Sequence, residues 1–274
     1  MIPIKNIPPG TRNGRIRLLQ GLILLAVLPL VLMGCWTTTA KVAIEPPWMP
    51  DVSGQMEDRE PPVGQVAPVF WLEDGVAIDG VFTEWRGLVS AQPYVVVYGS
   101  GFIPADASGD FTMATDGANL FLYADITDDV PNENKLPPAG AWRNDSVEFF
   151  IGTDTTPHRD FTPTDNHIRV VPASKTDPAV YSLSINDVDF TKETDARVRF
   201  RENGYRIEAA IPLALLGISD LRLGQKLRVE FQINDGDSSE RDRLIHWMSE
   251  KDDPYFDASV WGDAEIVLPQ EAAQ

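Results

Sequence analysis

Apolar and polar residues alternate in short runs along the chain from about residue 70 onward. Two such runs flank the dipeptide Asp116-Gly117, and two more flank Asn203-Gly204. Asp-Gly or Asn-Gly between alternating segments is a strong signal of a β-hairpin. These hairpins predict strands at residues 110–114, 120–126, 198–201 and 205–209. Further alternating runs predict strands at residues 147–151, 168–171, 181–185, 227–233 and 264–268.

Helical periodicity is nearly missing from the same region. Only residues 212–218 have a helical pattern, and a segment this short allows about two turns. Many short strands with turn signals between them, and almost no helix, are typical of two packed antiparallel sheets. We therefore predict an all-β fold, an antiparallel β-sandwich of jelly-roll type with at most one or two short helical turns.

The alternation also assigns polar side chains to one face of the predicted sheet. In a strand, neighbouring side chains point to opposite faces, so the apolar Val147, Phe149 and Ile151 place Glu148 on the other face. The same reasoning turns Arg169, and then Gln232 and Asn234, away from the core. These side chains either meet solvent, as most outer-face residues do, or they line a binding surface.

The first 34 residues have the order of a secretory signal. Four basic residues precede an apolar run over residues 18–33, which is shorter than the roughly 20 residues needed to span a bilayer. The run closes with Leu32-Met33-Gly34-Cys35, which resembles the lipobox of bacterial lipoproteins. This resemblance implies cleavage before Cys35 and a lipid anchor on it, which predicts an outer-membrane or cell-surface protein of the bacterial envelope. An uncleaved signal anchor is the alternative.

Proline-rich sequence follows the predicted lipidation site. Residues 35–69 repeat proline pairs and single prolines without an apolar period, so we interpret them as an extended tether. Residues 70–269 then form the predicted folded domain. Cys35 is the only cysteine, so no internal disulfide stabilises that domain, and the net charge of −18 disfavours nucleic acid as a partner.

Six short motifs occur in an order that is similar to carbohydrate-binding module family 9. They are Ile78-Asp79-Gly80 with Glu84-Trp85, Trp142, Asp145-Ser146-Val147-Glu148, Ala210-Ile211-Pro212, Asn234-Asp235 and Trp261-Gly262-Asp263. The resemblance covers nearly the whole predicted domain. It implies a calcium-containing β-sandwich that binds the end of a sugar chain between two aromatic rings.

The resemblance assigns residues to the sugar site. The first ring falls on Trp142 and the second on Tyr255, where sugar-binding members carry Trp; the neighbouring Phe256 is the alternative second ring. Polar contacts fall on Glu148, Arg169 and Asn234, with Gln232 as a weaker addition. These are the side chains that the strand alternation places on one non-core face. Aromatic rings suit the apolar face of a pyranose, and these polar groups suit its hydroxyls.

An acidic segment at residues 125–134 is the candidate calcium site. It offers Asp128, Asp129 and Asn132 directly after a predicted strand, and Asp79 resembles an aspartate of the same family. Calcium takes six to eight oxygen ligands from loops of this composition. A solvated acidic turn is the alternative, and Asp235-Gly236-Asp237 is a second candidate.

The resulting functional prediction is a non-catalytic lipoprotein that binds oligo- or polysaccharide and acts beside a glycoside hydrolase. The sequence contains no nucleophile elbow, His-Glu-x-x-His motif or phosphate loop, although a glycosidase carboxylate pair has no sequence signature. Two other functions stay open. One is an envelope scaffold that recognises a protein partner, and the other is a haem-binding sandwich that uses one of the three histidines or a methionine.

Overall fold

The computed structural model describes residues 64–238 and 240–269 of the chain. The described part is built from strands joined by loops, with three short 3-10 helices. The strands are β1 (Val66–Trp71), β2 (Val95–Tyr98), β3 (Ala107–Thr115), β4 (Asn119–Asp128), β5 (Ser146–Gly152), β6 (Asn166–Pro172), β7 (Tyr181–Ile185), β8 (Val188–Asp189), β9 (Asp195–Arg201), β10 (Gly204–Pro212), β11 (Lys226–Asp235), β12 (Arg243–His246) and β13 (Gly262–Val267). The 3-10 helices are η2 (Pro138–Arg143), η3 (Leu213–Leu216) and η4 (Ala258–Val260).

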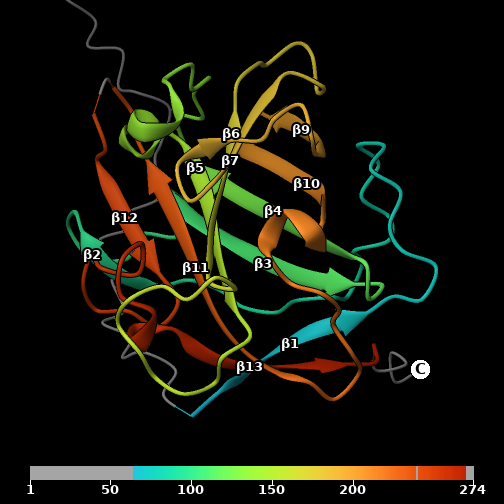
Figure 1. Ribbon diagram of the computed structural model, residues 1–274. Coiled ribbons are helices and arrows are strands. Elements are labelled where there is room, and N and C mark those ends of the chain that lie inside the picture. Colours follow the sequence, from blue (N-terminus) through green and yellow to red (C-terminus); the bar gives the residue numbers. More distant parts are fainter. Residues whose placement is uncertain (1–63, 239, 270–274) are drawn as a thin grey trace, which may run out of the picture. The chain divides into compact units, whose positions relative to one another are not determined.

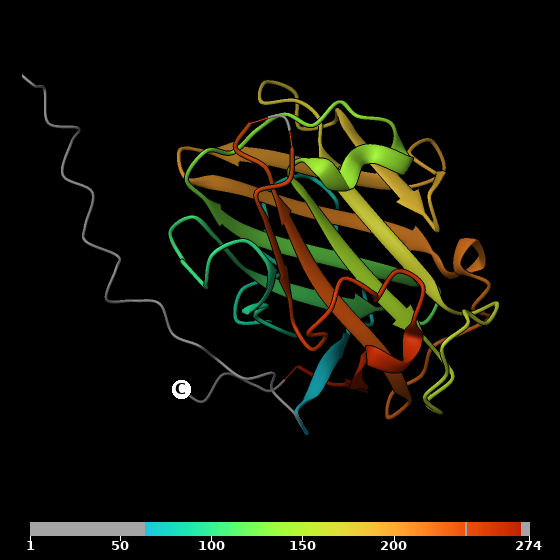
Figure 2. The ribbon, with the colours of Figure 1, turned by 90° about the vertical axis from the view of Figure 1, so that its left-hand side faces the viewer.

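The strands form one curled sheet whose two halves pack against each other. The strand order is β8-β7-β6-β5-β11-β13-β1-β3-β4-β10-β9, and β12 extends from β11 toward β2. Figures 1 and 2 show β5, β6, β7 and β11 as one layer, with β3, β4, β9 and β10 crossing behind it. Strands β13 and β1 lie side by side where the two layers join.

The core lies between the two layers, as the alternation predicted. The ring of Phe111 on β3 lies 5.1 Å from Phe149 on β5 and 5.6 Å from Phe231 on β11. All three side chains are fully buried. Because these phenylalanines come from the inward face of their strands, the other face of β5 and β11 is free to carry the polar residues.

The predicted all-β sandwich is confirmed, and all nine predicted strands are present. The sheet is not entirely antiparallel, because β1 runs parallel to both of its neighbours, β13 and β3. Pattern analysis missed β1, which begins at Val66 inside the predicted tether, because it contains Pro68 and follows proline-rich sequence. It also missed β2, β8 and β12, which have four residues or fewer.

The described residues contain no α-helix, although the sequence pattern suggested about two helical turns. The segment predicted at residues 212–218 forms only the four-residue 3-10 helix η3, which ends at Gly217 in the left-handed conformation. The other two 3-10 helices, η2 and η4, were not predicted. Within the described residues, no helix is both long and apolar enough to cross a membrane. The predicted signal at residues 1–34, Cys35 and most of the tether lie outside the described residues.

Candidate functional site

One row of side chains crosses the outer face of the first layer. Glu148 on β5 lies opposite Arg169 on β6 and opposite Gln232 on β11. On β12, His246 lies opposite Gln232 in turn. Strand register therefore brings together residues that are up to 98 positions apart, and Asn234 joins them two residues further along β11.

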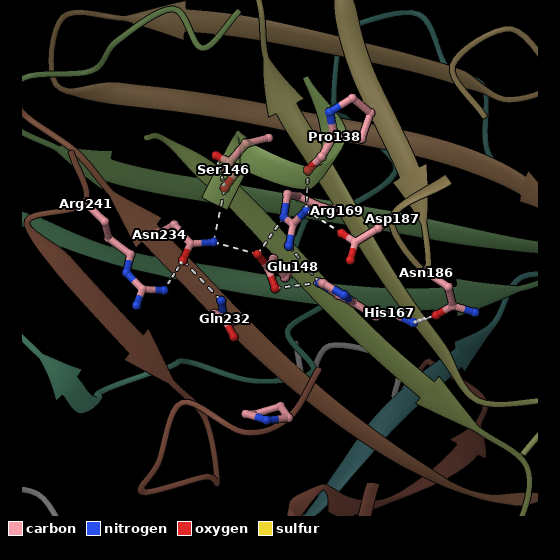
Figure 3. A network of polar contacts seen from close by, with 12 residues as sticks. Pro138, Ser146, Glu148, His167, Arg169, Asn186, Asp187, Gln232, Asn234 and Arg241 are labelled. Carbon is pink, nitrogen blue, oxygen red and sulfur yellow. Dashed lines mark hydrogen bonds and ion pairs between the residues drawn. The ribbon is translucent and has the colours of Figure 1, made fainter. Parts of the chain in front are cut away.

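Glu148 is the centre of a hydrogen-bonded network on this face (Figure 3). Its Oε1 accepts from Arg169 Nε at 2.7 Å and from Asn234 Nδ2 at 2.8 Å. Its Oε2 lies 2.6 Å from Nε2 of His167. Burial by itself raises the pKa of Glu148, but the adjacent Arg169 and His167 outweigh it and hold that pKa well below its usual range. Glu148 is therefore a buried, fully charged acceptor.

Second contacts fix the orientation of these side chains. Arg169 also donates through Nη1 to the backbone oxygen of Pro138 at 2.8 Å and to Asp187 at 3.1 Å. The ring of His167 stacks on Phe150, with centroids 4.6 Å apart and planes within 6°. Neither Arg169 nor His167 can turn without losing such contacts. The network around Glu148, which we call the polar floor, is therefore held in place before any ligand binds.

A pocket of about 240 Å³ opens above this network, and two aromatic residues stand in its walls. Trp142 comes from η2, which places it beside the start of β5. Tyr255 comes from the loop between β12 and β13 and is half exposed. The pocket is lined by Ala139, Trp142, Glu148, His167, Arg169, Asp187, Gln232, Arg241, Asp252 and Tyr255. Phe256 is not among the lining residues and packs edge-on against Tyr255 at 4.8 Å.

The structure thus brings five of the six predicted sugar-site residues to the wall of one pocket. The sixth, Asn234, lies buried directly behind it, where it donates to Glu148 and to Ser146. Unlike typical outer-face residues, Glu148, Arg169, Gln232 and Asn234 are almost fully buried. The surrounding loops and η2 cover the face that the alternation left open.

Sequence reasoning missed Arg241 and Asp252, which come from separate loops. The guanidinium of Arg241 lies 4.9 Å from the ring centre of Trp142 and pairs with Asp252 at 2.7 Å. It also donates to Asn234 Oδ1 at 3.3 Å. No sequence pattern marks loop residues of this kind. The sequence offered His167 only as one of three histidines for the haem alternative, and the sugar-site prediction left it out, although it precedes Arg169 by two positions and so shares its face.

Two buried acceptor atoms beside the pocket have no hydrogen-bond partner among the described residues. They are Oε1 of Gln232 and Nε2 of His246. Burial lowers the pKa of His246 to about 4, so the ring is neutral near pH 7. Its Nδ1 lies 3.2 Å from the carbonyl oxygen of Ser249, which places the ring proton on Nδ1 and leaves Nε2 as an acceptor. Both atoms therefore lack a hydrogen-bond donor, which a hydroxyl group supplies.

Apart from the pocket, a cluster of acidic residues lies where β4 and β11 end. Carboxylate oxygens of Asp128, Asp235 and Asp237 approach within 4.8 Å of one another, and Asp237 also groups with Asp106 and Asp129. Asp235 is buried, and its Oδ1 has no hydrogen-bond partner among the described residues. Burial and the neighbouring Asp128 raise the pKa of Asp235 to about 8. Arg243, which pairs with Asp106, sets one positive charge against five carboxylates, and such an excess of hard oxygen donors fits a divalent cation.

The predicted calcium ligands divide between this cluster and elsewhere. Asp128 and Asp129 belong to it, and the second candidate segment contributes Asp235 and Asp237. Asn132 lies at its edge, where its side chain donates to the backbone oxygen of Gly236. Asp79 belongs to neither group.

Asp79 instead closes a turn by accepting from the backbone N–H of Val81. The adjacent Gly80 donates to Glu208 on β10. The order of motifs along the sequence did not reveal that this loop packs on the outer face of the second layer.

Comparison with known proteins identifies the fold. A family model described as "Carbohydrate family 9 binding domain-like" matches residues 74–268. Two solved structures of a family 9 carbohydrate-binding module from Caldicellulosiruptor kristjanssonii, one with cellotriose and one with glucose, are similar at a TM-score of 0.58 and 21% identity. Each comparison covers 77% of this chain, and 97% and 100% of the respective modules. A search of curated proteins found no match. The chain belongs to the carbohydrate family 9 binding domain-like family.

Proposed function

We propose that this protein binds the terminal residue of a neutral oligosaccharide in the pocket between Trp142 and Tyr255. The observation that carries the proposal is the combination of these two aromatic walls with a floor of buried, oriented hydrogen-bonding groups. An aromatic face desolvates the C–H face of a pyranose, and the floor satisfies its hydroxyls. The similar modules of known structure hold glucose or cellotriose, which supports the same class of ligand here.

The unpartnered acceptor near the pocket supports this assignment over a charged ligand. Oε1 of Gln232 needs a donor, and Glu148 can accept further hydrogen bonds beyond those it already makes. A sugar hydroxyl donates to such an acceptor and simultaneously accepts from an arginine. A ligand that only accepts hydrogen bonds would satisfy the arginine donors but would leave the acceptor atoms of Gln232 and Glu148 without a donor.

We further propose a non-catalytic role at the cell surface. Lipid on Cys35 and the proline-rich tether would hold the domain on the bacterial envelope, where captured sugar chains are passed to a partner glycoside hydrolase. Labelled palmitate should be incorporated into the wild-type protein and not into Cys35→Ser, whose signal should also stay uncleaved. A wild-type protein that takes up no label and keeps its first 34 residues would instead favour the uncleaved signal anchor.

Calcium is proposed as the resident cation of the acidic cluster. Asp128, Asp235 and Asp237 would hold it, with Asp106 and Asp129 beside them. A divalent cation there would balance the carboxylate charge that the neighbouring Arg243 leaves uncompensated. It would also fix the end of β11 next to Asn234.

Tryptophan fluorescence tests the sugar proposal directly. The full chain, in a detergent without a sugar headgroup, is titrated with glucose and with cellotriose in the presence of calcium. We expect a saturable change that Trp142→Ala abolishes. The control is Trp71→Ala, which removes a half-buried tryptophan outside the lining residues and should leave the titration intact. A folded wild-type protein that responds to neither sugar would contradict the proposal and favour the protein-binding scaffold.

A further inference from the structure

Two arginine–aspartate pairs stand in the wall of the proposed sugar pocket. Arg169 Nη1 lies 3.1 Å from Asp187 Oδ1, and Arg241 Nη2 lies 2.7 Å from Asp252 Oδ2. In both pairs the arginine side chain is largely buried, at 5% and 12% exposed, and the aspartate is open to solvent, at 56% and 40%. A ligand that enters the pocket therefore meets carboxylates at its rim, with the guanidinium groups behind them.

The backbone holds one of these carboxylates in place at a cost. Asp187 follows Asn186 in the tight turn between β7 and β8, and both have positive φ, 63° and 51°. Asparagine and aspartate tolerate this conformation better than most residues, but it is uncommon outside glycine. Asn186 Oδ1 accepts from the backbone N–H of His167, which ties the turn to β6. The turn thus presents Asp187 to Arg169 from a fixed position.

We propose that Asp187 and Asp252 are specificity-determining residues that make the pocket select uncharged sugars and reject sugars that carry a carboxylate, such as uronic acids. The proposal rests on the proposed sugar-binding function and names the class of sugar that the site accepts.

The charges in the pocket wall explain the selection. A guanidinium without a partner is the best protein receptor for a carboxylate, because it offers two parallel N–H donors. Here both guanidinium groups are already engaged by aspartates. The lining carries three carboxylates, including Glu148, against two guanidinium groups, and its remaining titratable groups are the imidazole of His167 and the phenol of Tyr255. A sugar carboxylate would have to displace an aspartate and stay beside it, and like charges a few Å apart repel strongly where water is scarce.

A neutral hydroxyl meets no such conflict. It accepts a hydrogen bond from Arg169 or Arg241 and donates to Asp187 or Asp252 without breaking either pair. The same ion pairs that exclude an acid therefore leave a neutral sugar its full set of partners.

The test compares glucose with glucuronate, which differ by the carboxylate at one carbon. Affinities are measured by calorimetry on the full chain in a detergent without a sugar headgroup, with calcium present. We expect the wild-type protein to bind glucose at least about tenfold more tightly than glucuronate. Asp252→Asn and Asp187→Asn keep the shape of each side chain and remove its charge, so each should lower this ratio at least about threefold.

The matched control is Asp220→Asn. Asp220 also pairs with an arginine, Arg222, but both are exposed and neither lines the pocket. This variant should keep the wild-type ratio. Two separate aspartate variants are used so that one remains informative if the other fails to fold, as judged by circular dichroism.

Each result decides between the two proposals. If the wild-type protein binds neither sugar, the proposed function fails and the selectivity fails with it. If the wild-type protein binds glucose and glucuronate equally, or if both aspartate variants keep the wild-type ratio, only the selectivity is overturned. The selectivity is supported if the ratio of glucose affinity to glucuronate affinity falls in both aspartate variants and stays at the wild-type value in Asp220→Asn.

Discussion

Glu148 carries a negative charge although its side chain is almost completely buried, so the charge depends on its hydrogen-bond and ion-pair partners. It is 1% exposed and has hydrogen bonds or ion pairs with Arg169, His167 and Asn234. An ion buried with such partners contributes little net stability, but removal of one member leaves the others uncompensated. Glu148 therefore acts mainly by orienting the neighbouring side chains of the site, and the ion pairs add little net stability to the fold.

Glu148→Gln should lower both stability and sugar affinity. The substitution leaves Arg169 and His167 facing a neutral amide, and we expect a loss of about 3 kcal/mol in the free energy of unfolding. Urea denaturation measures this change. Glu133→Gln is the control, because Glu133 pairs with Lys135 at the surface, where solvent screens the pair, and its loss should change the free energy of unfolding far less. A Glu148→Gln variant as stable as the control would contradict the buried-charge argument.

Tyr255 gives a prediction of gained function. Indole offers a larger face than phenol, so Tyr255→Trp should bind glucose and cellotriose more tightly, by about 0.5–1.5 kcal/mol. Tyr255→Ala should weaken binding strongly. Phe256→Ala separates the two candidate rings, because Phe256 is similarly exposed but does not line the pocket. A larger loss in Phe256→Ala than in Tyr255→Ala would assign the second ring to Phe256.

At the scale of elements, the loop between β12 and β13 depends on one buried carboxylate. Glu230 on β11 accepts from the backbone N–H groups of Trp247, Met248 and Ser249 at 2.8–3.0 Å. Ser249 in turn donates its hydroxyl to Asp253 at 2.8 Å. These contacts lead from the sheet to the segment that carries Asp252 and Tyr255, so Glu230 positions one wall of the pocket.

Glu230 also predicts how stability changes with pH. Burial raises its pKa from 4.5 to about 7, against the opposing effect of the backbone N–H donors. A group with a raised pKa binds its proton more tightly in the folded state, so its stabilisation is complete below about pH 4.5 and is lost as the pH rises to about 7. The free energy of unfolding should therefore fall across this window, by at most about 1.4 kcal/mol per pH unit from this group.

The comparison of wild type with Glu230→Gln isolates that contribution. The glutamine amide nitrogen would face N–H donors, so the variant should be less stable by about 1–3 kcal/mol. The difference between the two proteins should shrink from pH 4.5 to pH 7, because only the wild type loses stability through this group. A difference in the free energy of unfolding that is the same at every pH would show that Glu230 does not titrate in this range.

At the scale of the whole molecule, the acidic cluster predicts dependence on a cation. Calcium that binds only the folded state stabilises it by mass action, by about 2.7 kcal/mol at 100 times its dissociation constant. We expect the melting temperature to fall when calcium is chelated and to recover when calcium is restored. Sugar affinity should fall in parallel, since Asn234 is directly adjacent to Asp235.

An Asp235→Ala variant should lose the calcium effect on melting temperature. Asp220→Asn, in an exposed pair outside the cluster, should keep it. A wild-type protein whose melting temperature does not respond to calcium would instead support the solvated acidic turn.

The sequence by itself determined nine of the thirteen described strands and the direction of the side chains in those nine. Alternation placed Val147, Phe149 and Ile151 inward and Glu148 outward, because the period of a strand is a local property of the backbone. Turn dipeptides such as Asp116-Gly117 located the hairpins for the same reason. Local chemistry did not reveal β1, since Pro68 argues against a central strand and its partners β13 and β3 are distant in sequence.

Only the tertiary structure decided which polar residues meet. Register across β6, β5 and β11 aligned Arg169, Glu148 and Gln232, and loop folding added Arg241 and Asp252. The same packing separated Asp79 from the acidic cluster and joined Asp235 and Asp237 to it. Burial and charge neighbours arise from contacts between segments far apart in the chain, and no local period of the sequence encodes those contacts.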